Sequence, residues 1–131
     1  MKKLMTIGFV LLLLFGCSEK TAEKHGEGIS IEFGVVGNIH YVGINLYVDE
    51  LIFSRESTYK EEEGSFQPGE IIWFHGPVIQ SNHIQEVEVV YSSNKDGSDA
   101  KTTNMIDITE AKEWVNTKLN HELELELLTF K

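Results

Sequence analysis

The stretch ISIEFGV, residues 29–35, decides the expected fold because apolar side chains alternate along it with polar or small ones. The stretch YVGINLYV, residues 41–48, repeats this alternation after the turn signal Gly37-Asn38. A period of two is typical of a β-strand with one buried face and one exposed face. The two stretches therefore predict the first strands of a β-rich domain.

The next strands are predicted from shorter patterns. Residues 51–57 can form a third strand, and the polar run 59–64 is expected to be an exposed loop. Residues 70–74 (EIIWF) are apolar on both faces, which predicts a central strand with Trp73 or Phe74 as the core anchor.

A hairpin is predicted in the second half of the chain. Val87, Val89 and Tyr91 alternate with glutamates, and Asp96-Gly97 favours a tight turn that returns the chain as a strand over residues 101–107. The oxygen-rich loop Asn94 to Asp99 could be compared with a calcium loop, but its glycine and its twelfth position do not match that motif. We interpret the loop as a hairpin turn.

The last third of the chain predicts one helix and a closing strand. Asp107-Ile108-Thr109-Glu110 has the spacing of a capping box, and the apolar residues that follow fit one helical face up to Leu119. Residues 122–127 (ELELEL) alternate regularly, which predicts a strand with its leucines in the core. Leu128 and Phe130 break the alternation and predict a bulge or a second buried face.

Together these patterns predict an all-β domain, an antiparallel immunoglobulin-like β-sandwich with one short helix. The sequence lacks the cysteine pair that brackets a tryptophan in immunoglobulin domains, so the likeness is one of architecture only. The alternative is an α+β domain with a curved antiparallel sheet over the helix at residues 107–119.

The first 17 residues have the order of an export signal. Lys2 and Lys3 precede an apolar run over residues 4–15, which is shorter than the about 20 residues of a transmembrane helix. The ending Leu14-Phe15-Gly16-Cys17 resembles the lipobox of bacterial lipoproteins, although Phe15 is bulkier than usual. This resemblance implies cleavage of residues 1–16, lipid on the thiol of Cys17, and a protein anchored on the extracytoplasmic face of the cell membrane.

Processing at this point would leave a lipidated cysteine with a polar tether, residues 17–28, and a single domain, residues 29–131. Cys17 is the only cysteine, so no disulfide is expected within the chain. Without Lys2 and Lys3, nine basic residues face 21 acidic ones, a formal charge of −12. This charge disfavours nucleic acid and favours basic proteins, cationic peptides or cations as partners.

Catalytic and metal-binding patterns are weak, so we expect no catalytic residues, no cofactor and no metal site. No serine lies in a Gly-x-Ser-x-Gly elbow, and the histidines lack the paired spacing of zinc sites. His121 is expected on the apolar side of the closing strand and His75 at a strand end, in structural roles. The three glutamates 61–63 are expected to be solvated rather than to share a cation.

These expectations favour a non-catalytic binding or accessory module, displayed by its lipid, that meets another envelope protein. A narrower hypothesis is an acidic immunity or inhibitor lipoprotein that binds a cationic toxin or a basic cell-wall hydrolase. A small envelope enzyme is the third hypothesis.

Overall fold

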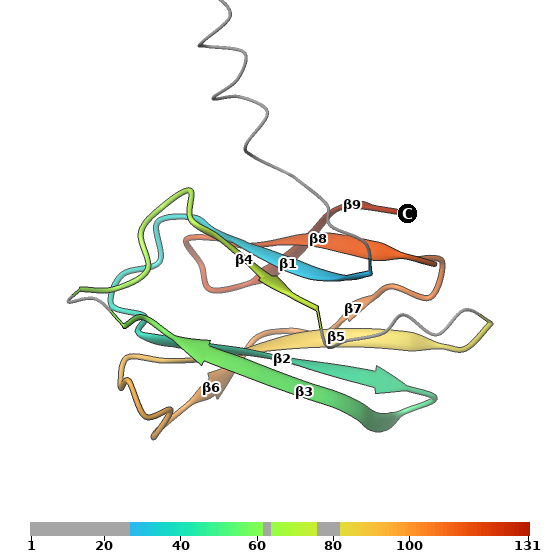
Figure 1. Cartoon of the computed structure of the whole chain (residues 1–131), viewed down its shortest axis with the longest axis horizontal. Coiled ribbons are helices and arrows are strands. Elements are labelled where there is room, and N and C mark those ends of the chain that lie inside the picture. Colours follow the sequence, from blue (N-terminus) through green and yellow to red (C-terminus); the bar gives the residue numbers. More distant parts are fainter. Residues whose placement is uncertain (1–26, 62–63, 76–81) are drawn as a thin grey trace, which may run out of the picture.

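The computed structural model describes residues 27–61, 64–75 and 82–131, and these residues form two packed β-sheets (Figure 1). The expected all-β sandwich is confirmed. Sheet A has the strand order β4 (Ile71–Phe74), β1 (Gly28–Phe33), β8 (Trp114–Leu119) and β9 (Leu125–Phe130). Sheet B has the order β3 (Leu51–Tyr59), β2 (Tyr41–Val48), β5 (Gln85–Ser92) and β6 (Lys101–Thr102), and β7 (Ile106–Asp107) also pairs with β5. The signal, the lipobox, Cys17 and the tether up to residue 26 lie outside the described residues.

The strand pairing is antiparallel except at one place. β1 runs parallel to β8, from Gly28 beside Trp114 to Phe33 beside Leu119. The first strand therefore lies inside sheet A, between β4 and β8, and depends on residues more than 80 positions later in the chain. This parallel pair differs from the fully antiparallel sandwich that we expected.

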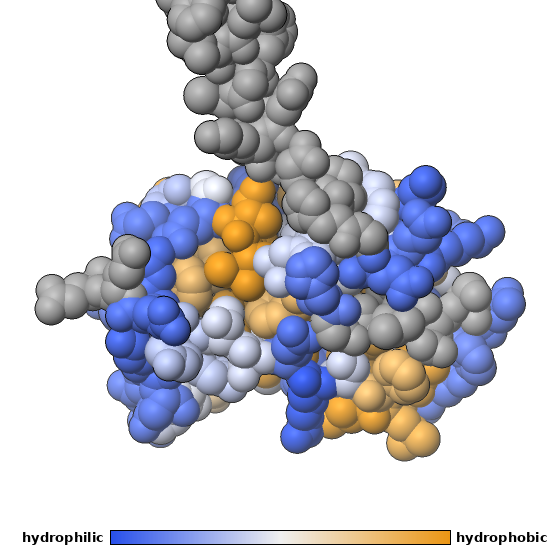
Figure 2. Space-filling view, in the orientation of Figure 1, coloured by the Kyte–Doolittle hydropathy of each residue, from blue (hydrophilic) through white to orange (hydrophobic). Residues whose placement is uncertain are grey.

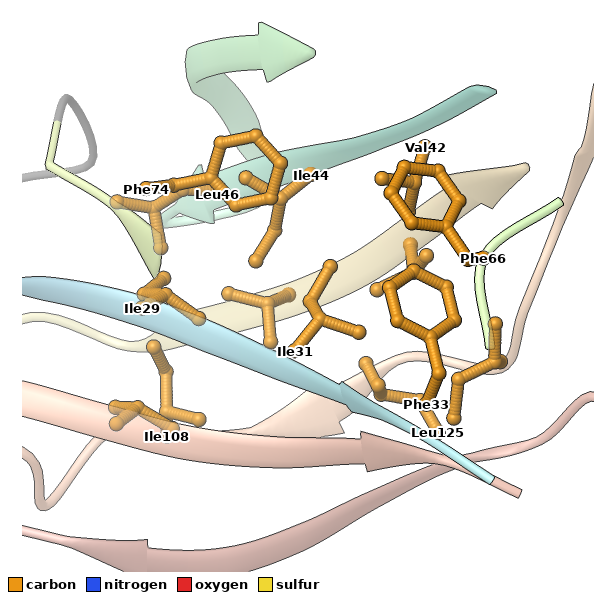
Figure 3. Packing of buried hydrophobic residues seen from close by; sticks show 14 of the residues in the cluster. Ile29, Ile31, Phe33, Val42, Ile44, Leu46, Phe66, Phe74, Ile108 and Leu125 are labelled. Atoms are coloured by element: carbon orange, nitrogen blue, oxygen red, sulfur yellow. The ribbon is translucent and has the colours of Figure 1, made fainter. Parts of the chain in front are cut away.

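The core lies between the sheets and is filled by the apolar positions of the alternating strands (Figure 3). Phe33 stacks on Phe66, which comes from the β3–β4 connection, with ring centroids 4.6 Å apart. Burial of each such side chain stabilises the fold by about 1.5–3 kcal/mol. The side chains that are most completely buried include Ile29, Ile31, Phe33, Val42, Ile44, Leu46, Val87, Val89, Val115 and Leu119.

The helix expected over residues 107–119 is wrong. The Asp107 carboxylate accepts a hydrogen bond from the backbone N–H of Thr109 (2.8 Å), which forms a turn, and β8 begins at Trp114. In β8, Val115, Thr117 and Leu119 alternate into the core, which is a strand period. No helix occurs among the residues that the structure describes, so the α+β alternative finds no support there.

The position expected for the strand at residues 70–74 is also wrong. β4 lies at the edge of sheet A and pairs only with β1. Phe74 is buried and serves as a core anchor, whereas Trp73 is half-buried and lies against Gly28, where an added Cβ would be 3.0 Å from the indole ring. Packing of the indole on the neighbouring strand explains how an edge strand can be apolar on both faces.

The closing strand begins later than residue 122. The side-chain oxygen of Asn120 accepts hydrogen bonds from the backbone N–H groups of Glu122 and Glu124 (2.9 and 3.0 Å), so residues 120–124 form a turn. Leu123 has a positive φ of 62° in this turn, and Leu125 is the first residue of β9 and is buried. Leu127 is 38% exposed, so only part of the expected leucine face reaches the core.

The irregularity expected near the C-terminal residues is confirmed. Thr117 of β8 faces Leu127 and Asn116 faces Thr129, so Leu128 is the extra residue of a β-bulge. The predicted hairpin is also confirmed, because both β6 and β7 pair with β5 on the far side of the Asp96-Gly97 turn. The returning strand expected over residues 101–107 is interrupted, because residues 103–105 lie between these two short strands.

Candidate functional site

The outward face of sheet B carries polar side chains that lie side by side on three neighbouring strands. Side chains at alternate positions of β2 and of its two neighbours point away from the core. They place Asn45 between Arg55 on β3 and Glu88 on β5, and Gly43 between Ser57 and Val90. We call this surface, which also includes Tyr41 and Tyr47, the sheet B face.

A hollow of about 480 Å³ lies on this face. It exists because Gly43 has no side chain: a Cβ there would lie 3.0 Å from the backbone oxygen of Glu56 and 3.1 Å from Cβ of Ser57. Larger residues at this position would fill the hollow and push β3 from β2. The side chains of Tyr41, Asn45 and Arg55 are among those that surround it.

Glu88 is the unusual residue of the sheet B face because it is acidic and yet only 8% of the residue is exposed. One carboxylate oxygen accepts hydrogen bonds from the Asn45 side-chain amide (3.1 Å) and the Tyr47 hydroxyl (2.9 Å). Among the described residues, no lysine, arginine or histidine forms an ion pair with it within 4.0 Å. A buried carboxylate held only by neutral donors keeps a strong attraction for a cation.

Tyr47 remains a hydrogen-bond donor to this carboxylate. Burial, followed by the hydrogen bond to Glu88 and the charge of Glu88, raises the pKa of the Tyr47 phenol, and the charge of Arg55 offsets only part of this effect. The phenol therefore stays protonated through the physiological pH range.

Two loop residues border the face at one end. The Lys95 ammonium lies 5.6 Å from the ring centroid of Tyr59 and donates a hydrogen bond to the backbone oxygen of Glu61 (3.2 Å). On the same side, a Cβ at Gly97 would lie 3.0 Å from the Tyr41 ring. The β5–β6 turn therefore packs against aromatic side chains of the face.

An apolar patch lies near the β2–β3 turn, where Leu51, Ile52 and Phe53 are exposed in succession (Figure 2). A second hollow, of about 510 Å³, opens between β9 and the β7–β8 connection. Its lining is mainly apolar and includes Ile84, Ile108, Ala111, Leu127 and Phe130. We call it the edge hollow.

Three histidines of the described residues have different surroundings. His83 lies 2.8 Å from a carboxylate oxygen of Asp49, and this hydrogen bond is the main reason that the pKa of Asp49 is lowered. His75 accepts a hydrogen bond from the Trp73 indole N–H (2.9 Å) at the end of β4, as expected for a structural residue. His121 is exposed in the 120–124 turn, so its expected place beside the leucines is wrong.

The other sequence candidates are the Asn94 to Asp99 loop and the three glutamates at 61–63. In the Asn94 to Asp99 loop, the Asp96 carboxylate accepts a hydrogen bond from the backbone N–H of Ser98 (2.9 Å), which lowers its pKa. Of the three glutamates at 61–63, only the first is described. Residues 27–61, 64–75 and 82–131 contain no group of three histidine or acidic side chains that could hold a metal ion.

Sequence reasoning missed the sheet B face. A glycine in the middle of an alternating strand could have indicated a close approach or a hollow. Glu88 gave no signal, because its burial depends on Asn45 and Tyr47, which lie more than 40 positions earlier.

Neither the apolar helices of a membrane protein nor a related protein identifies the function of this chain. In the described part of the chain, no helix has the length and hydropathy needed to cross a bilayer. Searches against protein-family models, curated proteins and solved structures find no match for this chain.

Proposed function

We propose that this chain is a lipid-anchored, extracytoplasmic binding module that has no catalytic activity and takes a basic polypeptide on the sheet B face. Support for the anchor comes from the sequence: the basic start, the short apolar run and the lipobox ending at Cys17. A polar tether then separates the lipid from the first strand. Two acyl chains would retain such a domain at a membrane, whereas one chain binds only marginally.

The observation that carries the proposal of a basic ligand is the buried carboxylate of Glu88. Its hydrogen bonds to Asn45 and Tyr47 fix its position, but both donors are neutral. A lysine or arginine side chain of a ligand would supply the missing positive charge, and the nearby tyrosine ring could stack on a guanidinium. Arg55, exposed across the hollow, would bind a carbonyl or carboxylate oxygen of the same ligand.

The overall charge supports the same class of ligand. A mature chain with a formal charge of −12 would attract basic proteins at long range and accelerate their association. An immunity or inhibitor role against a cationic toxin or a basic cell-wall hydrolase is the narrower form of this proposal.

The ligand site is tested with the processed, lipidated chain in detergent and a capped octalysine peptide as the probe. We expect Glu88→Gln to weaken binding about tenfold or more, which corresponds to about 1.4 kcal/mol. Glu124→Gln is the matched control because it removes the same charge from an exposed turn, and it should change the affinity less than twofold. Equal effects of the two variants would mean that the peptide responds only to net charge, and the proposed site would be wrong.

The physiological ligand is sought by pull-down of the lipidated protein from its own membranes, with Glu88→Gln as the comparison sample. A basic protein captured only by the unchanged chain would support the proposal. Substrate turnover that disappears in His75→Ala or His121→Ala would instead favour the enzyme hypothesis.

The anchor is tested separately by Cys17→Ser. An oxygen nucleophile does not replace the thiol in lipid transfer, so we expect this variant to incorporate no labelled palmitate and to be released or left uncleaved. Normal incorporation would contradict the lipoprotein assignment and leave the ligand site untouched.

A further inference from the structure

The outer edge of β9 presents backbone groups that point away from sheet A. In an antiparallel pair, residues whose N–H and C=O groups point to the partner strand alternate with residues whose groups point outward. Trp114 and Lys131 exchange both backbone hydrogen bonds (3.1 and 2.9 Å), so the backbone N–H and C=O of Phe130, the residue before Lys131, point outward. At the other end of β9, before the bulge, the backbone oxygen of Glu124 accepts a hydrogen bond from the N–H of Asn120. The same alternation then directs the backbone groups of Leu125 and Leu127 outward.

One of these outward positions is already occupied by a peptide-like group. The side-chain amide of Asn104 donates a hydrogen bond to the backbone oxygen of Leu125 (3.1 Å), and its oxygen accepts one from the backbone N–H of Leu125 (2.8 Å). A residue of a neighbouring antiparallel strand would form the same pair of bonds. Asn104 therefore marks where another strand would run along β9.

The edge hollow begins beyond this point. The residues whose backbone groups point outward have side chains on the inner face, and Leu127 and Phe130 accordingly line the hollow, opposite Ile108 and Ala111. A strand beside Leu127 and Phe130 would direct alternate side chains into this hollow. The apolar lining suits aliphatic side chains.

The charges at the hollow favour a basic segment. Asp107 and Glu110 line the hollow, and the Lys131 ammonium is already 3.5 Å from a carboxylate oxygen of Glu113. Side chains on the exposed face of an added strand would point away from the hollow and lie beside Glu126 of β9. The Glu126 carboxylate accepts a hydrogen bond from the neutral amide of Asn120 (2.6 Å) and forms no ion pair with a described residue, so basic residues on this face would meet an opposite charge.

We propose that an extended segment of a partner protein, with aliphatic residues alternating with basic ones, adds to sheet A along β9 and fills the edge hollow. Its backbone would pair with Leu127 and Phe130, and Asn104 would limit the pairing at Leu125. This surface lies on the other sheet from the sheet B face, and it is independent of the function proposed above.

The test is amide hydrogen exchange, resolved by NMR, of the full-length chain in detergent with a capped eight-residue peptide of alternating valine and lysine. We expect saturating peptide to slow exchange at Leu127 and Phe130 by about tenfold or more. The amides of Glu126 and Thr129 already face β8 and serve as internal controls, with changes below twofold. Unchanged exchange at Leu127 and Phe130 would overturn the proposal.

Three further comparisons separate the explanations. A peptide of alternating serine and lysine has the same charge and should give no protection, and equal protection by it would show that the hollow plays no part. Leu127→Lys should abolish the effect, whereas Leu128→Lys, at the bulge outside the hollow, should preserve it. Protection that rises with protein concentration and without peptide would identify a second copy of the chain as the occupant and contradict a partner protein.

Discussion

The buried end of β9 gives the sharpest test of the fold. Leu125 is 3% exposed and faces the core beside Leu119, whereas the adjacent Glu124 is exposed in the preceding turn. Leu125→Ala removes three buried carbon atoms, a transfer loss of about 2.4 kcal/mol at 0.8 kcal/mol for each, and a residual cavity raises the usual cost to 2–5 kcal/mol. Because partly buried Leu123 and Ile106 also pack against the core and can move, we expect about 2–3 kcal/mol.

The assay is urea unfolding of residues 27–131, followed by tryptophan fluorescence. With a slope of about 1–3 kcal/mol/M, the midpoint for Leu125→Ala should fall by about 1–2 M. Glu124→Ala should change the free energy of unfolding by less than about 0.5 kcal/mol, as is usual for exposed positions. Leu125→Glu should lower the free energy of unfolding far more than Leu125→Ala does, because a carboxylate would be buried without partners. Equal midpoints for Leu125→Ala and Glu124→Ala would refute the placement of β9 in the sandwich.

Three other outcomes are expected. Burial raises the pKa of Glu70, but the hydrogen bonds that its carboxylate accepts from Lys60 (2.6 and 2.7 Å) and from the backbone N–H of Gln67 (2.7 Å), together with the charge of Lys60, outweigh burial and lower the pKa below 4.5. The stability that Glu70 contributes is therefore present above pH 4.5 and is lost as pH falls through the lowered pKa. The urea midpoint of Glu70→Gln should lie below that of the unchanged domain at pH 7, and the two midpoints should converge in acid. Gly28→Ala should lower the thermal midpoint strongly, because φ is 145° and the new Cβ would clash with the backbone oxygen of Phe74. The circular dichroism spectrum of residues 27–131 should be that of β-structure and should not change with a reducing agent, and a helical spectrum would contradict the fold.

Alternation with a period of two predicted the strands near residues 29–33, 41–48 and 85–92, but at residues 122–127 it predicted only the last part correctly, because Asn120 holds residues 120–124 in a turn. The prediction failed at residues 107–119, where two periods were compatible with the sequence. Ile108, Ala111, Val115 and Leu119 are all buried, as a helical stripe would require. In the structure, a turn supplies the first two and a strand the others. Thr117, whose hydroxyl donates a hydrogen bond to the backbone oxygen of Ser30 (2.7 Å), is the residue that distinguishes the two readings. That bond joins strands 87 positions apart, which a local pattern cannot contain.

The candidate sites were less predictable than the fold. Alternation predicted that Asn45, Tyr47 and Glu88 would leave the core, but not that they would meet, because register sets cross-strand neighbours. The amide of Asn104 resembles any loop asparagine in the sequence. Its meaning depends on the position of β9, 21 residues later.

The place of β1 has a mechanical consequence. β1 enters at Gly28 and lies between an antiparallel neighbour, β4, and a parallel neighbour, β8. A force that pulls on the chain ahead of residue 28, while the opposite end of the domain is held, acts along this strand. The hydrogen bonds on both sides of β1 then share the load in shear, rather than opening one after another as in a peeled hairpin. Forced unfolding is limited by the rate of crossing its barrier, so this arrangement should make the domain resist tension applied through its N-terminal segment.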